Sequence, residues 1–227
     1  MRAIDYARLS QQETIPSLNG IRAISVLIVA LSHSGFGTVV PGGLGVTIFF
    51  FLSGYLITTL MIAELDQTGN LGILSFYARR VFRLMPPLLI TLAIAYCLVA
   101  SGILPGAISF KGVGTQLLYF ANYYLVFFDQ GNTTIPAGTG VLWSLAVEEH
   151  YYFLYPLIIL ALFKTGVNLK TVGILLASVC FVILLWRIKL VHDGSLEGRT
   201  SYASDTRIDS IIYGALLALW FKPCLSG

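Results

Sequence analysis

Long apolar segments, separated by short breakers, are the feature that most restricts the folds open to this chain. Seven segments can be read: Leu18–Ser34, Leu44–Ala63, Pro87–Leu104, Val113–Phe128, Leu142–Phe163, Thr171–Leu190 and Ile208–Phe221. Most of them approach the roughly 20 residues that an α-helix needs to cross a bilayer. Because backbone polar groups in lipid must be hydrogen-bonded internally, such segments predict helices. We therefore expect an all-α, polytopic transmembrane helix bundle of about seven spans.

The composition supports a membrane protein and excludes several other classes. Of the 227 residues, 56% are hydrophobic and only 11% are charged, whereas about a quarter of a soluble domain is charged. The net charge of +3 is small and the basic residues form no run or stripe, so we expect no nucleic-acid partner. Cys97, Cys180 and Cys224 form no CxxC pair and lie in or beside apolar segments. We expect apolar thiols, not a metal site or a disulfide.

The distribution of charge predicts the orientation of the chain. Residues 1–17 are polar, and no cleavage motif of small residues follows the first apolar run. We therefore expect a cytoplasmic N-terminus over residues 1–17 and a transmembrane domain over residues 18–227. With that orientation the cytoplasmic side holds nine basic residues, namely Arg2, Arg8, Arg79, Arg80, Arg83, Arg187, Lys189, Arg199 and Arg207. The opposite side holds four, namely Lys111, Lys164, Lys170 and Lys222. This bias favours a cytoplasmic N-terminus.

The first apolar segment carries two ionisable residues, Arg22 and His33. They are separated by 11 residues, which at about 100° per residue returns to nearly the same helix face, roughly 16 Å further along. Ionisable groups at membrane depth normally face a protein interior or a wet cavity. One alternative is that Arg22 extends to the headgroups and His33 caps the other end at the interface. Their shared stripe favours a functional role.

The segment Ser75–Pro87 holds Arg79, Arg80 and Arg83 between aromatic and aliphatic residues. This pattern predicts a short basic amphipathic helix at the cytoplasmic interface, ending where Pro86 and Pro87 begin the third span. Lipid anchoring alone would explain the pattern. The alternative is an anion site, because Arg80 and Arg83 are one turn apart and their guanidinium groups can converge on phosphate.

The segment Leu142–Ile158 places two adjacent carboxylates, Glu148 and Glu149, inside an apolar run. Ser144, Glu148 and Tyr152 recur at a spacing of four and form one polar stripe, while Glu149 points about 100° away. Alternatively, the helix begins late and both glutamates lie in the interface. The aromatic residues of this segment would also suit an interfacial belt: Trp143, Tyr151, Tyr152 and Tyr155.

Asp205, Arg207 and Asp209 alternate in sign just before the last apolar segment. They predict either a self-neutralising cluster at a helix mouth or a fixed Asp–Arg pair that orients a base or a substrate. His150 follows two acids and is expected to pair with them, and His192 is expected to be solvated. Motifs of zinc hydrolases, α/β-hydrolases and nucleotide-binding folds are absent from the sequence.

Taken together, five ordered segments resemble the acyltransferase 3 family of bacterial membrane proteins, over Ile15 to about Leu219. The segments are SLNGIRAISVLIVALSH, GGLGVTIFFFLSGYLI, FYARRVFRLMPPL, LWSLAVEEHYYFLYPL and SDTRIDSIIYGALLA. The resemblance implies transfer of an acyl group, often acetyl, from acyl-coenzyme A to a carbohydrate hydroxyl, in a multi-pass protein of the bacterial inner membrane. Carbohydrate acceptors in the family include cell-surface glycans and glycosylated metabolites.

The resemblance also implies roles for individual residues. Arg22 and His33 match the family's Arg-x10-His pair, in which the histidine is taken as catalytic. Arg80 and Arg83 match its Arg-x-x-Arg motif, which is linked to the acyl donor. As a hypothesis, His33 removes the proton of the acceptor hydroxyl or takes the acyl group transiently. Arg22 would then stabilise a developing negative charge.

Glu148 and Glu149 match the family's Glu-Glu motif and are expected to serve catalysis, with Glu148 orienting the imidazole. The remaining motif positions are expected to bind or orient substrate: Ser53, Trp143, Ser144, Tyr152, Asp205, Arg207 and Asp209. Acyl-coenzyme A is expected as co-substrate, with no permanently bound cofactor.

Two features depart from the family pattern. Thr47 occupies a position where members often carry an aspartate, and family members usually continue for several spans beyond the length seen here. We therefore expect a chain that lacks the C-terminal spans of the family. Two other functions stay open: a proton-coupled transporter, which also uses intramembrane Arg, His and Glu, and an inactive remnant.

Overall fold

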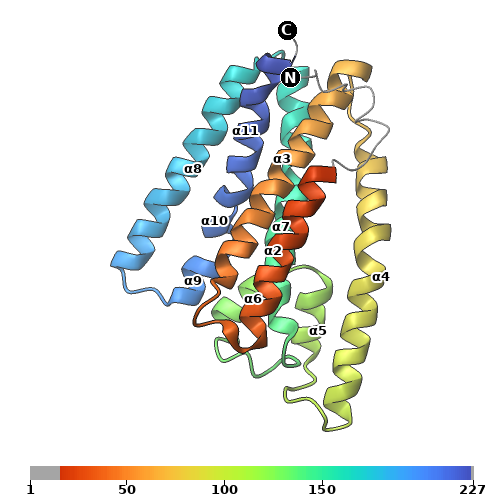
Figure 1. Cartoon of the computed structure of the whole chain (residues 1–227), viewed down its shortest axis with the longest axis vertical. Coiled ribbons are helices and arrows are strands. Elements are labelled where there is room, and N and C mark those ends of the chain that lie inside the picture. Colours follow the sequence, from red (N-terminus) through yellow and green to blue (C-terminus); the bar gives the residue numbers. More distant parts are fainter. Residues whose placement is uncertain (1–15, 226–227) are drawn as a thin grey trace. The chain divides into compact units, whose positions relative to one another are not determined.

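The computed structural model describes residues 16–225, and every regular element among them is helical (Figure 1). The predicted all-α class is therefore confirmed for this part of the chain. The predicted polar segment 1–17 lies almost wholly outside the described residues, as do the side chains of Lys222 and Cys224. The elements are α2 (Pro16–Leu31), the π-helical turn η1 (Ser32–Phe36), α3 (Gly42–Thr68), α4 (Ile73–Ala100), α5 (Phe110–Leu117), α6 (Ala121–Phe127), the 3₁₀ turn η2 (Thr139–Val141), α7 (Leu142–Lys164), α8 (Leu169–His192), α9 (Glu197–Tyr202), α10 (Ser204–Arg207) and α11 (Asp209–Leu225).

Five helical segments among the described residues are long and apolar enough to cross a membrane. They are Leu18–Phe36, Gly42–Thr68, Ile73–Ala100, Thr139–Lys164 and Leu169–His192, and a shorter apolar helix covers Asp209–Trp220. Five of the seven predicted segments thus coincide with a long helix, and the last coincides with the shorter one. The predicted fourth segment, Val113–Phe128, has no such counterpart.

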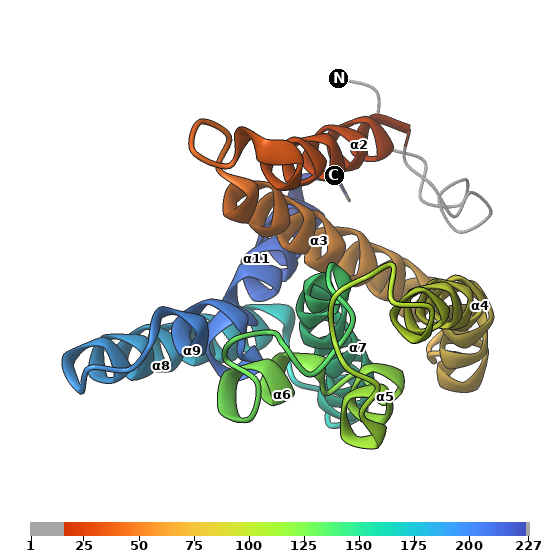
Figure 2. The same ribbon diagram turned by 90° about the horizontal axis from the view of Figure 1, so that it is seen from below.

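The chain divides into two compact units. The first contains the described parts of Met1–Leu71, Ile158–Ile183 and Asp209–Gly227, and the second contains Gly72–Leu157 and Leu184–Ile208. In the first unit, α3 packs against both α2 and α11 (Figures 1 and 2).

Two glycines allow the backbones of α3 and α11 to meet. A Cβ atom on Gly54 of α3 would lie 1.9 Å from the carbonyl oxygen of Ile211, and one on Gly214 of α11 would lie 1.8 Å from that of Phe51. These distances are far inside van der Waals contact, so only glycine fits at either position. Small residues at a helix crossing are a common means of close packing in membrane proteins.

In the second unit, the segment between α4 and α7 leaves the C-terminal end of α4 and returns toward it before α7 begins (Figure 1). Pro105, just after α4, accepts a hydrogen bond at 2.9 Å from the amide of Ala137, just before η2. Across the same junction, the Gln116 amide accepts from the Tyr96 hydroxyl at 2.9 Å and donates to Thr139 Oγ1 at 2.8 Å. The two ends of the segment are therefore joined to each other.

The prediction of one span over Val113–Phe128 is accordingly wrong. The segment forms two short helices, α5 of 8 residues and α6 of 7, separated at Leu118–Phe120. Tyr119 takes a left-handed backbone conformation with φ 59°, which ends one helix and redirects the chain into the next. At 1.5 Å per residue, neither helix approaches the roughly 30 Å of a bilayer core.

The predicted helix boundary at Pro86 is also wrong. The basic segment Ser75–Arg83 and the third apolar segment form a single helix, α4, with Pro86 and Pro87 inside it. Proline's fixed φ is compatible with a helix, although each proline removes an amide donor and crowds the carbonyl one turn earlier. Arg79, Arg80 and Arg83 therefore lie on a spanning-length helix itself and not on a separate interfacial helix.

Candidate active site

Arg22 lies in the first unit on α2 and reaches the motif serine of α3. Its Nη2 donates a hydrogen bond to Ser53 Oγ at 3.4 Å, and its guanidinium lies 5.6 Å from the centroid of the Phe49 ring. Ser53 is 2% exposed and is held on the buried side of α3. Two residues that the sequence analysis placed on different spans thus meet in the structure.

His33 lies just beyond the end of α2, in the π-helical turn η1. Its Nδ1 is 2.8 Å from the carbonyl oxygen of Val29, and because a carbonyl only accepts, Nδ1 carries the proton. The Nε2 atom of the neutral ring is then the free acceptor. Gly35, with φ 96°, reverses the chain two residues later, and its left-handed conformation favours glycine. The backbone from Arg22 to His33 is α-helical in α2 and π-helical in η1, and the His33 side chain is exposed.

Arg80 of α4 forms an ion pair with Glu149 of α7 in the second unit. The distance between Arg80 Nη2 and Glu149 Oε1 is 2.7 Å, and the side chains are 21% and 18% exposed. The guanidinium also lies 3.3 Å from the centroid of the Tyr152 ring. Three residues assigned to donor binding, catalysis and substrate orientation therefore form one cluster.

Arg83 is exposed on the surface of α4, and no hydrogen bond or ion pair joins it to the described residues. It lies one turn beyond Arg80 on the same helix. The two arginines thus differ: the guanidinium of Arg80 is held by Glu149 and Tyr152, and that of Arg83 is open to a ligand.

Glu148 is buried at 7% exposure, within a helix that begins at Leu142, before both glutamates. Glu149 is engaged by Arg80, so the alternative of two interfacial carboxylates is not supported. Ser144 donates to the carbonyl of Val141 at 3.0 Å, and the Trp143 ring lies 4.9 Å from that of Tyr202. The predicted aromatic belt is wrong for the three tyrosines, Tyr151, Tyr152 and Tyr155, since each is 3% exposed.

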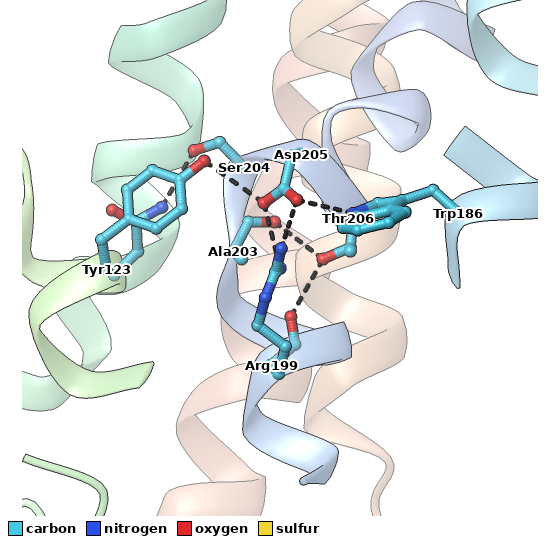
Figure 3. Close-up of polar contacts among 8 residues, drawn as sticks. Tyr123, Trp186, Arg199, Ala203, Ser204, Asp205 and Thr206 are labelled. Atoms are coloured by element: carbon cyan, nitrogen blue, oxygen red, sulfur yellow. Dashed lines mark hydrogen bonds and ion pairs between the residues drawn. The ribbon is translucent and has the colours of Figure 1, made fainter. Parts of the chain in front are cut away.

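Asp205 lies at the centre of a polar network in the second unit (Figure 3). Both of its carboxylate oxygens accept from the Arg199 guanidinium. Trp186 Nε1 donates to Oδ2 at 2.8 Å and the Tyr123 hydroxyl to Oδ1 at 3.3 Å. Burial opposes ionisation of this carboxyl, but the hydrogen bonds from Arg199 and Trp186 outweigh it and hold its pKa below the usual value.

Asp205 is therefore paired with Arg199 of the preceding helix α9, which sequence reasoning counted only toward topology. Arg207 is partly buried on α10, and Asp209 is 2% exposed at the start of α11, where it accepts from the amide of Ser210. The structure describes Asp209 in the first unit and Asp205 and Arg207 in the second. Asp205 thus has a fixed arginine partner in Arg199, which lies outside the motif.

A second network, missed by sequence reasoning, joins α7, α6 and α10. His150 Nδ1 lies 2.6 Å from Ser204 Oγ, which also accepts from Asn122 Nδ2 at 2.9 Å. The expected pairing of His150 with the neighbouring acids is thus replaced by a contact with serine. The only sequence signal was the position of Ser204 beside Asp205. His192 is 88% exposed on its side chain, as predicted, with Asp193 Oδ1 3.6 Å away.

Two of the three cysteines lie among residues whose side chains the structure describes: Cys97 is exposed and Cys180 is buried, and each is a free thiol. Among residues 16–225, no three His, Cys, Asp or Glu side chains are grouped in a way that would hold a metal ion.

Five spanning-length apolar helices among the described residues define a polytopic membrane protein, and several of these helices carry partly buried charged groups. A family model described as an acyltransferase domain matches residues 15–223, so the chain belongs to the acyltransferase 3 family.

Two curated relatives illustrate the match. One from Staphylococcus aureus (strain COL), named "Putative O-acetyltransferase", is 30% identical over 227 residues, covering 96% of this chain and 37% of the relative. The peptidoglycan O-acetyltransferase OatA of Listeria monocytogenes is 28% identical over 214 residues, covering 90% of this chain and 33% of OatA. The chain thus spans little more than a third of the length of the relatives it matches. No solved structure matches it significantly.

Thr47, which replaces the aspartate common in the family, donates its hydroxyl to the carbonyl of Gly43 at 2.9 Å within α3. The position therefore carries no charge in this chain.

Proposed function

We propose that the chain acts as a membrane O-acyltransferase, moving an acetyl group from acetyl-coenzyme A to a hydroxyl of a carbohydrate. The observation that carries this proposal is the family match over residues 15–223, which includes every motif residue placed above. The function of a family resides in its site, and here the site residues of that family form defined contacts inside apolar helices.

Donor binding falls to Arg80 and Arg83. Guanidinium groups bind phosphate oxygens through paired, charge-assisted hydrogen bonds, and coenzyme A carries a diphosphate and a 3′-phosphate. Arg83 offers an exposed guanidinium, while Arg80 is oriented by Glu149 and by the Tyr152 ring. In the proposed orientation, with the N-terminus in the cytoplasm of a bacterial inner membrane, both arginines face the side where acetyl-coenzyme A is made.

Catalysis of the transfer falls to His33. Because Nδ1–H donates to Val29, Nε2 is available to take the proton of the acceptor hydroxyl. The hydroxyl oxygen then attacks the acyl carbon, the bond from that carbon to its leaving atom breaks, and the proton passes to the leaving atom. Arg22, fixed at Ser53, supplies a positive charge for the oxyanion that develops in this step.

The proposed acceptor is a glycan of the cell envelope. The name of the Listeria relative specifies peptidoglycan, and peptidoglycan is therefore the first acceptor to test. A glycosylated metabolite is the second.

The test is whether a radiolabelled acetyl group is transferred from coenzyme A to the carbohydrate. Membrane vesicles containing the 227-residue chain are incubated with radiolabelled acetyl-coenzyme A and a peptidoglycan or oligosaccharide acceptor. We expect label in an ester on the carbohydrate, released by mild base. A proton-coupled transporter would move the carbohydrate across the vesicle membrane without labelling it, and a remnant would do neither.

A further inference from the structure

The network around Ser204 has the composition of a nucleophile and its base. Asn122 Nδ2 can only donate, so Ser204 Oγ accepts from it at 2.9 Å and directs its own proton to His150 Nδ1 at 2.6 Å. A serine hydroxyl hydrogen-bonded to an imidazole acceptor is the arrangement that activates serine for acyl chemistry. Ser204 and Asn122 are buried, at 6% and 0% exposure.

The neighbouring residues fix the serine in place. Thr206 Oγ1 bonds the carbonyl oxygens of Ala203 and Arg199, and Asp205 is held by Arg199, Trp186 and Tyr123 (Figure 3). The residues on both sides of Ser204 are thus immobilised. The His150 ring packs between Phe120 and Tyr123, with centroid distances of 5.1 and 5.9 Å. Preorganised groups of this kind are typical of reactive sites.

The network also leaves hydrogen-bonding capacity unused. Asn122 Oδ1 is buried and has no hydrogen-bond partner among the described residues, while His150 makes a hydrogen-bonding contact with the backbone of Tyr119. A network that served only to tie helices together would satisfy its buried polar atoms. An open acceptor beside a serine is what an incoming hydroxyl would use.

We propose that Ser204 is a second reactive centre, which carries the acyl group as a serine ester between donor and acceptor, with His150 as its general base. The proposal rests on the acyl transfer proposed above. Ser204 Oγ attacks the thioester carbon while its proton moves to His150 Nδ1. The carbon–sulfur bond breaks, and the proton passes to the sulfur to give the thiol.

The second half-reaction restores the serine. A carbohydrate hydroxyl, whose proton is taken by His33 as proposed above, attacks the ester carbon. The bond between the acyl carbon and Ser204 Oγ breaks, and the proton returns to Oγ. The products are the carbohydrate ester and the original serine, with no further reactant consumed.

The experiment traps this ester. The full chain in membrane vesicles is incubated with radiolabelled acetyl-coenzyme A without acceptor, quenched in acid and digested, and the acetylated peptide is located by mass spectrometry. We expect acetyl on Ser204 in the wild-type chain and none in Ser204→Ala. In Ser204→Cys we expect a thioester that neutral hydroxylamine cleaves.

Two further variants separate chemistry from folding. His150→Gln keeps a group that accepts from Ser204 but takes no proton, so the acylation rate should fall by about 10²- to 10⁴-fold. Ser201→Ala, in the preceding helix α9, should be acylated on Ser204 at the wild-type rate. Each variant is first shown to be monodisperse in detergent.

The readouts distinguish this inference from the proposed function. Wild-type chain that forms carbohydrate ester while Ser204 carries no acetyl overturns the serine intermediate and leaves the transferase intact. Acetyl on Ser204 that depends on His150 supports the intermediate even where the tested carbohydrate stays unlabelled, in which case the acceptor was chosen wrongly.

Discussion

Arg80 and Glu149 form a 2.7 Å ion pair between α4 and α7, inside two helices that are otherwise largely apolar. The pair is about four-fifths buried, and the Tyr152 ring covers the guanidinium at 3.3 Å. Removing one partner of such a pair leaves the other as a buried charge without compensation, and this is costly. The pair therefore has a structural role in addition to any role in binding.

Loss of the Glu149 charge should destabilise the second unit. Glu149→Gln preserves the shape of the side chain and leaves Arg80 without its counter-charge, so we expect a loss of about 2 kcal/mol in the free energy of unfolding. Denaturant titration in detergent measures it. Glu197→Gln, an exposed acid in α9, is the matched control and should change stability by less than about 0.5 kcal/mol. Equal stability of the two variants would contradict this role of the pair.

Replacing Arg83 should weaken the binding of acetyl-coenzyme A without lowering the stability of the fold. Charge-assisted hydrogen bonds are worth about 1.5–3 kcal/mol, so Arg83→Ala should weaken acetyl-coenzyme A binding by about tenfold or more. Its exposed position predicts an unchanged unfolding midpoint. Arg79→Ala removes an equally exposed arginine outside the Arg-x-x-Arg motif and serves as the control. Equal binding by the two variants, measured by equilibrium dialysis, would remove Arg83 from the donor site.

The α3–α11 crossing should not accommodate a methyl group added at either glycine. Gly54→Ala and Gly214→Ala each place a Cβ atom within 2 Å of a backbone carbonyl oxygen, so the helices must separate. Overpacking of this kind costs about 1–3 kcal/mol, and we expect a lower melting temperature in detergent for both. Gly43→Ala, in the same helix, has no neighbouring atom within 4 Å and should melt like the wild type. A Gly54→Ala chain with the same melting temperature as Gly43→Ala would contradict the close approach of the α3 and α11 backbones.

Protonation of Asp205 should lower the free energy of unfolding, and it should do so only at acidic pH. Its pKa in the folded chain lies below the usual value, so its contribution is fully present above the unfolded pKa, near 4. The contribution is lost as the pH falls through the folded pKa. Asp205→Asn should lower stability at pH 7 and weaken its dependence on pH below about 4. Asp193→Asn, whose side chain is 52% exposed, should leave the profile unchanged. A profile of Asp205→Asn that parallels the wild type would contradict the role of Arg199 and Trp186.

The sequence predicted the helical class because long apolar segments leave the backbone few alternatives in lipid. Its errors have physical causes. Hydropathy along Val113–Phe128 is high, but the left-handed Tyr119 and the hydrogen bond between Ala137 and Pro105 turn the segment back on itself. Neither is visible in a hydropathy window. Pro86 lies inside a helix because the cost of a missing donor was lower than the cost of ending the helix.

The motif residues of the site were predictable, but their partners were not. Arg80 and Glu149 were both singled out, yet nothing local shows that residues 69 positions apart pair with each other. Asp205 was expected to pair with a nearby arginine, and the short helix α9 supplies one, Arg199, that the motif does not contain. The contact between Ser204 and His150 was missed because a serine and a histidine 54 residues apart acquire chemical meaning only when the fold brings them together.

The most direct test of the proposed acyl transfer compares two histidine variants in the radiolabelled acetyl-coenzyme A assay. His33→Ala removes the imidazole whose Nε2 is available as base, and His192→Ala removes an imidazole with an 88% exposed side chain. We predict that His33→Ala inserts normally into the membrane but forms labelled carbohydrate ester at a rate at least about 10²-fold lower, while His192→Ala matches the wild type. An undiminished yield of labelled ester from His33→Ala would contradict the account.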